Sequence, residues 1–385
     1  MSQTRSHRTA NSLEVAISGG SMGGLFAGIA LERAGHDVTI YERSTGELRS
    51  RGAGIVAQQH VRRFLERHDI VVPEEITTAS SERRFLARDG DVRASRPDSM
   101  VFTSWDAVYR RLRDAFPDDR YRMGAEVVDV APETATATIA GGSERVADLV
   151  VAAEGGQSST RRRLFPEVEP KVADYVAWRG VVPESDLATD TVEAFDDRFV
   201  FYQGSNLLIL AYLIPGADGG TEPGERRLNW VWYDTLADRD RTAIFTDASD
   251  TERAFTVPPG RLRDPVRRRQ LERAANVLPP VFETVAAETE APFVQAIYDL
   301  AVPEMTVERA CLLGDAAFVA RPHTAAGTAK AAGDGAELAN ALEENDSPDA
   351  ALSSWDETRT EYGSRLVARG KRMGDERLHL ATRPS

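Results

Sequence analysis

Cysteine, lysine and long apolar runs are all scarce in this chain of 385 residues. Its one cysteine, Cys311, excludes an intramolecular disulfide and most cysteine-based metal sites, so we expect no metal. No apolar run approaches the roughly 18 residues that a membrane helix needs. The first residues, MSQTRSHRTANS, are polar and have no apolar core after their arginines, unlike a secretory signal. We therefore expect a cytoplasmic chain without membrane contact, preceded by a disordered segment at residues 1–12.

Basic residues are outnumbered, and almost all of them are arginine. The 61 Asp and Glu exceed the 47 Lys and Arg, which gives a net charge of −14. Only three of the 47 are lysine, so the other 44 are arginine. This balance opposes nucleic acid as a partner, although it leaves room for a local basic patch. An acidic, lysine-poor surface is typical of proteins kept soluble in high salt by self-repulsion, and it indicates a halophilic source.

The N-terminal part has the pattern of a strand, a helix and a second strand. An apolar strand at residues 13–20 ends in glycine, a helix pattern follows at residues 21–36, and residues 37–43 form a strand with few polar interruptions. Such a strand is typical of a parallel sheet. Residues 175–232 are rich in aromatic and β-branched residues, which predicts an antiparallel sheet inserted after the first unit begins.

The first strand-to-helix junction carries the turn GGSMGG, which resembles the G-x-G-x-x-G pattern of dinucleotide sites. Gly19 and Gly24 match the first and third glycines, Gly23 precedes the third, and Ser21 replaces the second. Glu42 lies 23 residues after Gly19, about where a carboxylate binds ribose hydroxyls. The alternatives are a merely tight turn and, for Glu42, a solvated strand end. The strand-helix-strand context favours nucleotide binding.

A second junction of this kind lies near the C-terminus. An apolar strand leads to Gly314 and Asp315, and a loop of small residues then enters a helix near Ala326, Gly327 and Thr328. Asp315 is placed to bond a polyol, and the N–H groups at the helix start form a second anion site. The alternative is an ordinary strand-to-helix junction with an N-capping acid.

The order of three segments resembles that of the FAD-dependent aromatic hydroxylases, which are single-component flavoprotein monooxygenases. These segments are VAISGGSMGGLFAGIALERAGHDVTIYERS, ADLVVAAEGGQSSTRRRLF and CLLGDAAFVARPHTAAGTAKAAGDGAELANALE. Within that family the chain is most similar to the dihydroxypyridine-type branch, through FTSWDAVY, YVAWRGV and RPHTAAGTAK. In that branch, as here, an aromatic residue replaces the arginine that often contacts the flavin near Trp105.

The resemblance implies an α/β fold with a Rossmann-like FAD-binding domain, an inserted antiparallel-sheet substrate domain and C-terminal helices. The FAD-binding domain would comprise residues 13–170 and 291–345, with an excursion into the substrate region around residues 70–105. The substrate sheet would comprise residues 171–290. Residues 346–385 would form the C-terminal helix and tail.

The resemblance also assigns residues to the cofactor. They are Gly19, Ser21, Gly23, Gly24, Glu42, Arg43, Arg51, Glu154, Gly155, Gly314, Asp315, Ala326, Gly327 and Thr328. Glu154-Gly155 replaces the family's Asp-Gly motif, and its longer side chain leaves the contacts open. Asp315 matches the aspartate that binds the ribityl hydroxyls, and the loop to Gly327 would pass the flavin ring. Arg51 either reaches the ribityl chain or is solvated.

The implied reaction uses NADH or NADPH to reduce FAD, after which O₂ adds at the flavin C4a. The resulting hydroperoxide is an electrophile and requires an electron-rich ring, so we expect a small hydroxylated aromatic or N-heteroaromatic substrate. A base near the substrate hydroxyl would help. His323 is the candidate because it is the one histidine near a flavin motif, and its alternative is a histidine bonded to backbone at a helix start.

Two other functions stay open at this point. One is a flavoprotein of the same fold that performs epoxidation, oxidation or dehydrogenation of a larger apolar compound, and the other is a non-catalytic dinucleotide-binding protein. A homodimer is compatible with the sequence. Six aromatic residues of the inserted sheet are candidates to stack on a substrate, although we expect most to be core: Tyr175, Trp178, Tyr202, Tyr212, Trp230 and Trp232.

Overall fold

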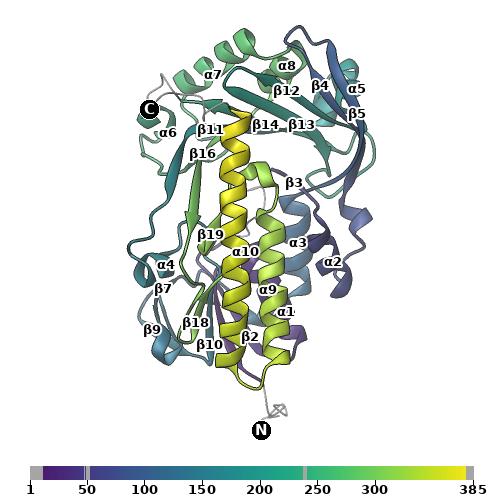
Figure 1. Ribbon diagram of the computed structural model, residues 1–385. Coiled ribbons are helices and arrows are strands. Elements are labelled where there is room, and N and C mark those ends of the chain that lie inside the picture. The colour runs from purple at the N-terminus through teal and green to yellow at the C-terminus, as the bar shows by residue number, and fades with distance from the viewer. Residues whose placement is uncertain (1–11, 47, 49–52, 237–240, 379–385) are drawn as a thin grey trace.

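The computed structural model describes residues 12–46, 48, 53–236 and 241–378. Figure 1 shows a lower unit of sheet and helices, an upper unit built around a large sheet, and a long C-terminal helix that runs along both. This arrangement confirms the expected α/β class. The expected lead-in, apart from residue 12, and the tail after residue 378 lie outside the described residues.

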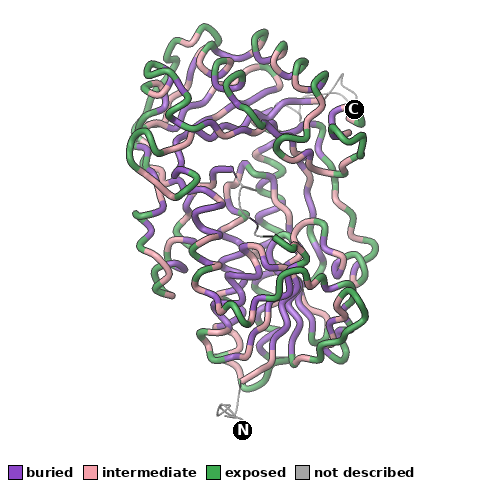
Figure 2. Tube along the Cα trace, turned by 180° about the vertical axis from the view of Figure 1, so that it is seen from behind, coloured by how far each residue is buried: buried purple, intermediate pink, exposed green. Residues whose placement is uncertain are grey.

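The lower unit contains a six-stranded sheet whose central strands are parallel. Its order is β17 (Thr306–Val307), β18 (Ala310–Leu312), β10 (Leu149–Ala152), β1 (Glu14–Ser18), β2 (Asp37–Glu42) and β6 (Tyr121–Met123). The four strands β18, β10, β1 and β2 are mostly apolar and buried, as expected for parallel strands covered on both faces. Figure 2 shows buried segments gathered in this unit.

Helices α1 (Met22–Arg33), α3 (Trp105–Ala115) and α9 (Gly327–Glu344) pack with this sheet, and α2 (Gln59–Arg67) packs on α9. A separate three-stranded sheet contains β7 (Val127–Ala131), β8 (Thr136–Ile139) and β9 (Ser143–Val146). The helix α4 (Ser159–Leu164) follows β10 and contacts β7. The carboxyl ends of β1, β2, β10 and β18 therefore meet at one edge of the parallel sheet.

The upper sheet is mainly antiparallel, with β12 and β4 as its one parallel pair among the described strands. Its order is β15 (Thr256–Val257), β16 (Phe293–Ala301), β11 (Lys171–Pro183), β14 (Arg227–Thr235), β13 (Leu207–Ile214), β12 (Arg198–Gly204), β4 (Thr78–Leu86), β5 (Val92–Ser104) and β3 (Gly54–Val56), with β19 (Phe318–Val319) paired to β16. The strand β16 belongs to this sheet, although the sequence places residues 291–345 with the FAD-binding domain. That domain division stays a prediction.

The two faces of the upper sheet have different surroundings because side chains alternate along each strand. On one face, Trp178, Trp230 and Trp232 join a buried apolar cluster with α7 (Asp264–Val277) and α8 (Pro280–Glu288). The short helices α5 (Thr189–Phe195) and α6 (Arg241–Phe245) contribute to the same cluster. The expectation that most of the sheet aromatics are core is confirmed for these three tryptophans.

The helix α10 (Pro348–Arg377) is 30 residues long and runs along both units (Figure 1). In the lower unit, Arg359 donates two hydrogen bonds to Asp334 on α9, at 2.8 and 2.5 Å. Near its other end, Asp375 accepts a hydrogen bond from Arg321 at 2.7 Å. Charged groups thus attach α10 to the chain at two levels.

Candidate active site

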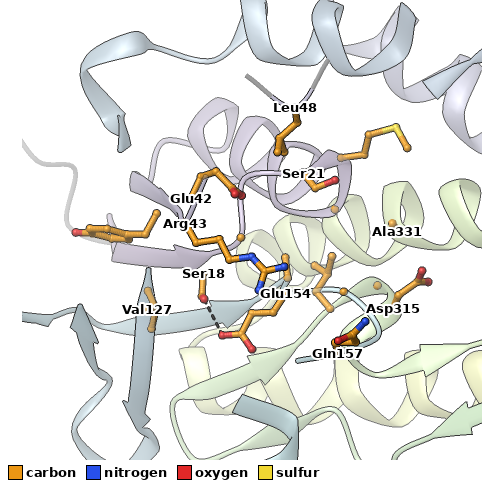
Figure 3. Close-up of a pocket in the computed structure, with 18 of the residues that line it drawn as sticks. Ser18, Ser21, Glu42, Arg43, Leu48, Val127, Glu154, Gln157, Asp315 and Ala331 are labelled. Atoms are coloured by element: carbon orange, nitrogen blue, oxygen red, sulfur yellow. Dashed lines mark hydrogen bonds between the residues drawn. The ribbon is translucent and has the colours of Figure 1, made fainter. Parts of the chain in front are cut away.

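A cavity of about 330 Å³ lies at the carboxyl ends of β1, β2, β10 and β18, the edge where parallel sheets of this kind bind ligands (Figure 3). Most of the residues that the sequence assigned to the cofactor line it together: Gly19, Ser21, Gly23, Glu42, Arg43, Glu154, Gly155, Gly314, Asp315, Gly327 and Thr328. Gly24 and Ala326 lie next to lining residues. Arg51 lies outside the described residues.

The glycine turn has the geometry of a phosphate-binding loop. Gly19 adopts a φ of +103°, which side-chain-bearing residues rarely tolerate. A Cβ on Gly24 would lie 1.9 Å from the carbonyl oxygen of Gly19, so no other residue fits there. Ser21 is the N-cap residue of α1, yet its hydroxyl makes no capping hydrogen bond. This hydroxyl and the first N–H groups of α1 are thus available to a ligand.

Glu42 shapes the turn as well as lining the cavity. The Gly20 N–H donates to its Oε2 and the Ser44 N–H to its Oε1, both at 2.8 Å. Beneath the turn, the Tyr121 hydroxyl donates to the Gly20 carbonyl oxygen, also at 2.8 Å. A carboxylate has about four acceptor positions, so Glu42 can still accept ribose hydroxyls. The exposed side chain of Arg43 extends across the cavity towards Glu154 (Figure 3).

The Glu154 carboxylate accepts several hydrogen bonds from neighbouring residues. Ser18, Ser158 and Thr160 donate hydroxyl hydrogen bonds to it at 2.7, 2.6 and 2.8 Å, and the Thr160 N–H donates at 3.0 Å. Burial would raise the pKa of the Glu154 carboxyl, but these hydrogen bonds outweigh it and hold that pKa below its ordinary value. The Glu154 carboxylate thus joins the end of β1 to the start of α4.

The second strand-to-helix junction, from β18 through Gly314 and Asp315 to α9, also lies at the cavity. Gly314 adopts a φ of +65°, and the half-exposed Asp315 lines the cavity. The helix α9 begins at Gly327, with Ala326 as its N-cap residue, and has no acidic side chain in its first turn. Gly327 and Thr328 line the cavity, so the free N–H groups and partial positive charge of this helix start face it, with no acidic side chain of the helix itself nearby.

His323 lies outside this cavity, in a buried turn between the two units. Its Nε2 is 2.9 Å from the Tyr175 hydroxyl oxygen, and its ring centroid is 4.3 Å from that of Tyr233. Its Nδ1 has no hydrogen-bond partner among the described residues. Burial, reinforced by the charges of Arg377 and Arg321, lowers the pKa of His323 to about 3, so the imidazole is neutral at pH 7.

Four side chains on the other face of the upper sheet form what we call the inner cluster: Arg179, Tyr212, Asn229 and Tyr233. Asn229 and Tyr212 lie beside Gly54 on β3, where a Cβ would lie 2.8 Å from Asn229 and 2.9 Å from Tyr212. Tyr233 lies further along the same face of β14, next to His323. The Gly54 N–H donates to Asn229 Oδ1 at 2.8 Å, and Arg179 is 3.5 Å from the Gly54 carbonyl oxygen.

The inner cluster combines one positive charge with two phenols. Burial raises the pKa of Tyr212, and that of Tyr233 to about 12, although the charge of Arg179 opposes both shifts. Asn229 Nδ2 has no hydrogen-bond partner among the described residues. Arg179 and Asn229 are not among the candidates that the sequence motifs indicate. The alternation of side chains along a strand could have identified them. In β11 and β14, Arg179, Asn229 and Tyr233 occupy alternate positions to the tryptophans and therefore lie on the opposite face of the sheet.

A second cavity, of about 340 Å³, adjoins the first. The two share Arg43, Glu154, Gln157 and Asp315 as lining residues. The second extends to Gln295, which accepts a hydrogen bond from Arg179 at 3.0 Å, and to Pro322, which precedes His323. Gln295 thus connects the second cavity to Arg179 of the inner cluster.

The donor set fits FAD. The Gly19–Gly24 segment with the start of α1 suits a pyrophosphate, and the start of α9 suits a second group that carries negative charge. Glu42 and Asp315 offer carboxylates to ribose and ribityl hydroxyls. Among the described residues, no group of three or more His, Cys, Asp or Glu side chains is placed to hold a metal ion.

None of the helices in the described ranges combines the length and apolar character that crossing a membrane requires.

Comparison with known proteins gives matches along almost the whole chain. A family model described as FAD binding domain-like matches residues 172–299. The 2,6-dihydroxypyridine 3-monooxygenase of Paenarthrobacter nicotinovorans is 32% identical over 369 residues, which cover 95% of this chain and 91% of that protein. The aurachin C monooxygenase/isomerase of Stigmatella aurantiaca is 28% identical, with 94% and 89% covered.

Solved structures of similar proteins also match almost the whole chain. The structure of 2,6-dihydroxypyridine-3-hydroxylase from Arthrobacter nicotinovorans matches with a TM-score of 0.90 at 31% identity, covering 96% of this chain and 93% of that one. HpxO from Klebsiella pneumoniae, complexed with FAD and uric acid, matches with a TM-score of 0.76 at 18% identity, covering 96% and 91%. At that identity the second likeness concerns the fold alone.

Proposed function

This chain belongs to the FAD-dependent aromatic hydroxylases, and within that family we propose that its substrate is a small N-heteroaromatic ring carrying ionisable hydroxyl groups. As a monooxygenase of this type, it places one oxygen atom of O₂ on the ring. The other atom leaves as water, with two electrons from NADH or NADPH. Its membership of an enzyme family removes the support for a non-catalytic dinucleotide-binding protein.

Bound FAD supplies the oxygen chemistry, and the chain supplies binding and orientation. We propose that the N–H groups after Gly19 and the Ser21 hydroxyl hold the pyrophosphate, with Glu42 on the adenosine ribose and Arg43 beside it. Glu154 and Gly155 form the floor of the site. Support comes from the shared cavity that these residues line. Position 24 adds to it, because a Cβ there would lie 1.9 Å from the Gly19 carbonyl oxygen and only glycine fits.

At the flavin end, we propose that Asp315 binds the ribityl hydroxyls and that the start of α9, at Ala326, Gly327 and Thr328, receives negative charge from the reduced ring. The absence of an acidic side chain in the first turn of α9 supports this role. Arg51, whose place the structure does not describe, stays a sequence-based candidate for the ribityl chain.

The inner cluster carries the proposal about the substrate. It comprises Arg179, two buried phenols and Asn229, whose amide nitrogen has no hydrogen-bond partner among the described residues. Arg179 connects it to the second cavity by donating a hydrogen bond to the lining residue Gln295. A ring with acidic hydroxyls fits this combination, because the guanidinium stabilises an ionised oxygen and the phenols and amide donate hydrogen bonds to it. The Paenarthrobacter relative, which this chain matches over 95% of its length, is named for such a ring.

We propose His323 as the group that accepts the proton of a substrate hydroxyl. A neutral imidazole has one nitrogen that can accept. The tautomer decides which one, because the Tyr175 hydroxyl either donates to Nε2 or accepts from it. A ring that becomes an anion beside His323 would raise the histidine pKa again, which favours proton transfer only when substrate is bound.

The experiment is a substrate panel on the purified full chain. Hydroxypyridines that include 2,6-dihydroxypyridine, hydroxybenzoates and larger apolar ring compounds are each tested for stimulated oxidation of NADH and of NADPH. Mass spectrometry then checks each product for one added oxygen atom, because uncoupled turnover yields peroxide instead. We expect oxygenated product from a hydroxypyridine. Oxygenation or oxidation restricted to a larger apolar compound would replace the substrate proposal with the alternative one.

We also infer that the protein works in a salt-rich cytoplasm, without nucleic acid as a partner. The support is the net charge of −14 and the scarcity of lysine. Activity measured from low salt to molar KCl tests this inference, and a decline towards high salt would contradict it. A homodimer is a further proposal, and light scattering of the purified protein tests it.

A further inference from the structure

Lys330 is a buried lysine in a chain that otherwise places its charge in arginine. It lies in the first turn of α9 and is only 1% exposed, whereas Lys171 and Lys371 are exposed. Its Nζ has no hydrogen-bond partner among the described residues. An ammonium group in this condition is costly to bury, so its position calls for a compensating role.

Two carboxylates lie at equal distance from this ammonium group. Lys330 Nζ is 3.8 Å from Asp315 Oδ1 and 3.8 Å from Asp334 Oδ2. Asp334 already has closer partners, because Arg359 Nε donates to its Oδ1 at 2.8 Å and the Gly314 N–H donates to its Oδ2 at 3.1 Å. The charge of Asp334 is therefore balanced by Arg359, and the charge of Lys330 is left for Asp315.

Asp315 has the opposite situation. Its side chain is 52% exposed and accepts no hydrogen bond from the described residues, so Lys330 is its nearest charged partner among them. Asp315 lines both cavities, whereas Lys330 lines neither. The ammonium group thus lies behind the carboxylate as seen from the cofactor cavity.

From this geometry we propose that Lys330 is a positioning residue for the cofactor, which holds the Asp315 carboxylate in the orientation that receives FAD. The Arg359–Asp334 pair fixes Lys330 in turn, so that charges alternate from Asp315 through Lys330 and Asp334 to Arg359 on α10. The inference rests on the FAD site of the proposed function and adds a residue to it.

This role predicts opposite effects on folding and on binding. Lys330→Met keeps the approximate length of the side chain and removes a buried ammonium group that makes no hydrogen bond to any described residue. The apoprotein should therefore be as stable as the wild type or more stable. FAD binding should weaken about tenfold, because Asp315 loses the charge that orients it. A residue needed only for packing or folding would lower both properties together.

The test titrates deflavinated full-length protein with FAD, using quenching of flavin fluorescence for Kd and thermal unfolding of the apoprotein for stability. Lys371→Met, the same substitution at an exposed site, is the matched control and should change neither quantity. In an Asp315→Asn background, Lys330→Met should cause little further loss, because the two residues act as a unit.

Three results would overturn the inference. They are an unchanged Kd in Lys330→Met, a weaker Kd accompanied by a less stable apoprotein, and additive losses in the double variant. A wild-type protein that fails to bind FAD would instead overturn the proposed function. A weaker Kd with undiminished apoprotein stability and no additivity supports the inference.

Discussion

Replacing Glu154 with glutamine tests whether its carboxylate holds the strand-to-helix junction at the cofactor site. Four donor groups lie 2.6–3.0 Å from that carboxylate, and three of them are hydroxyls that can turn to meet an amide. The fourth, the Thr160 N–H, cannot turn. Each bond loses its charge assistance, which is worth about 1 kcal/mol. With partial compensation from the hydroxyls, we expect the apoprotein to lose about 2–4 kcal/mol of unfolding free energy at pH 7.

The pH dependence makes this prediction more specific. The pKa of Glu154 is lower in the folded protein than its ordinary value of 4.5, so its stabilising effect is fully present above pH 4.5. The effect is lost as pH falls through the folded-state pKa. The gap between wild type and Glu154→Gln, measured by urea unfolding, should thus be largest near neutral pH and shrink in acid. Glu126→Gln is the control, since Glu126 lines the same cavity, is exposed, and has no side-chain hydrogen bond among the described residues. A negligible gap at pH 7, or a gap that stays constant into acid, would refute the reasoning.

Three further substitutions test the site. Gly24→Ala should abolish FAD retention on gel filtration, because its Cβ would lie 1.9 Å from the Gly19 carbonyl oxygen, and a yellow, folded variant would contradict the assigned turn. Ser21→Gly should keep FAD bound, since backbone N–H groups remain, and loss of flavin would show that the hydroxyl makes a required contact. His323→Asn should lower kcat at least tenfold with FAD affinity unchanged, and the loss should shrink as rising pH ionises the substrate without help. Equal kcat at all pH values would exclude His323 as the proton acceptor.

That the residues assigned to the cofactor line one cavity could be predicted, because the sequence signals are local. Gly19 directly follows β1 and Gly24 lies in the first turn of α1, and the spacing to Glu42 follows from the length of this strand-helix-strand unit. The contacts of Glu154 could not be predicted, since they depend on which donors the end of β1 and the start of α4 bring near. The interaction between His323 and Tyr175 joins residues 148 positions apart, and no periodicity indicates such a pair.

The upper sheet marks a different limit. The aromatic and β-branched composition predicts that the sheet exists. Because its strands are apolar on both faces, the sequence does not indicate which face is directed towards the expected cofactor site. Trp178 and Arg179 are adjacent in sequence and lie on opposite faces of β11, and only the placement of α7 and α8 identifies the side to which each belongs.

The two ion pairs that join helix α10 to its neighbours limit where residues can be inserted into or deleted from this chain. Arg359 and Asp375 are 16 residues apart, which corresponds to about 24 Å along a helix axis, and each is bonded to a fixed partner. One inserted residue between them would shift one anchor by about 1.5 Å and rotate it by roughly 100°, so both partners could not be reached at once. Substitutions on the exposed side of α10 are therefore tolerable, whereas insertions and deletions between the anchors are not. A tag, reporter or linker is better placed at an exposed turn such as Gly141–Gly142, where a Cβ would meet no atom within 4 Å.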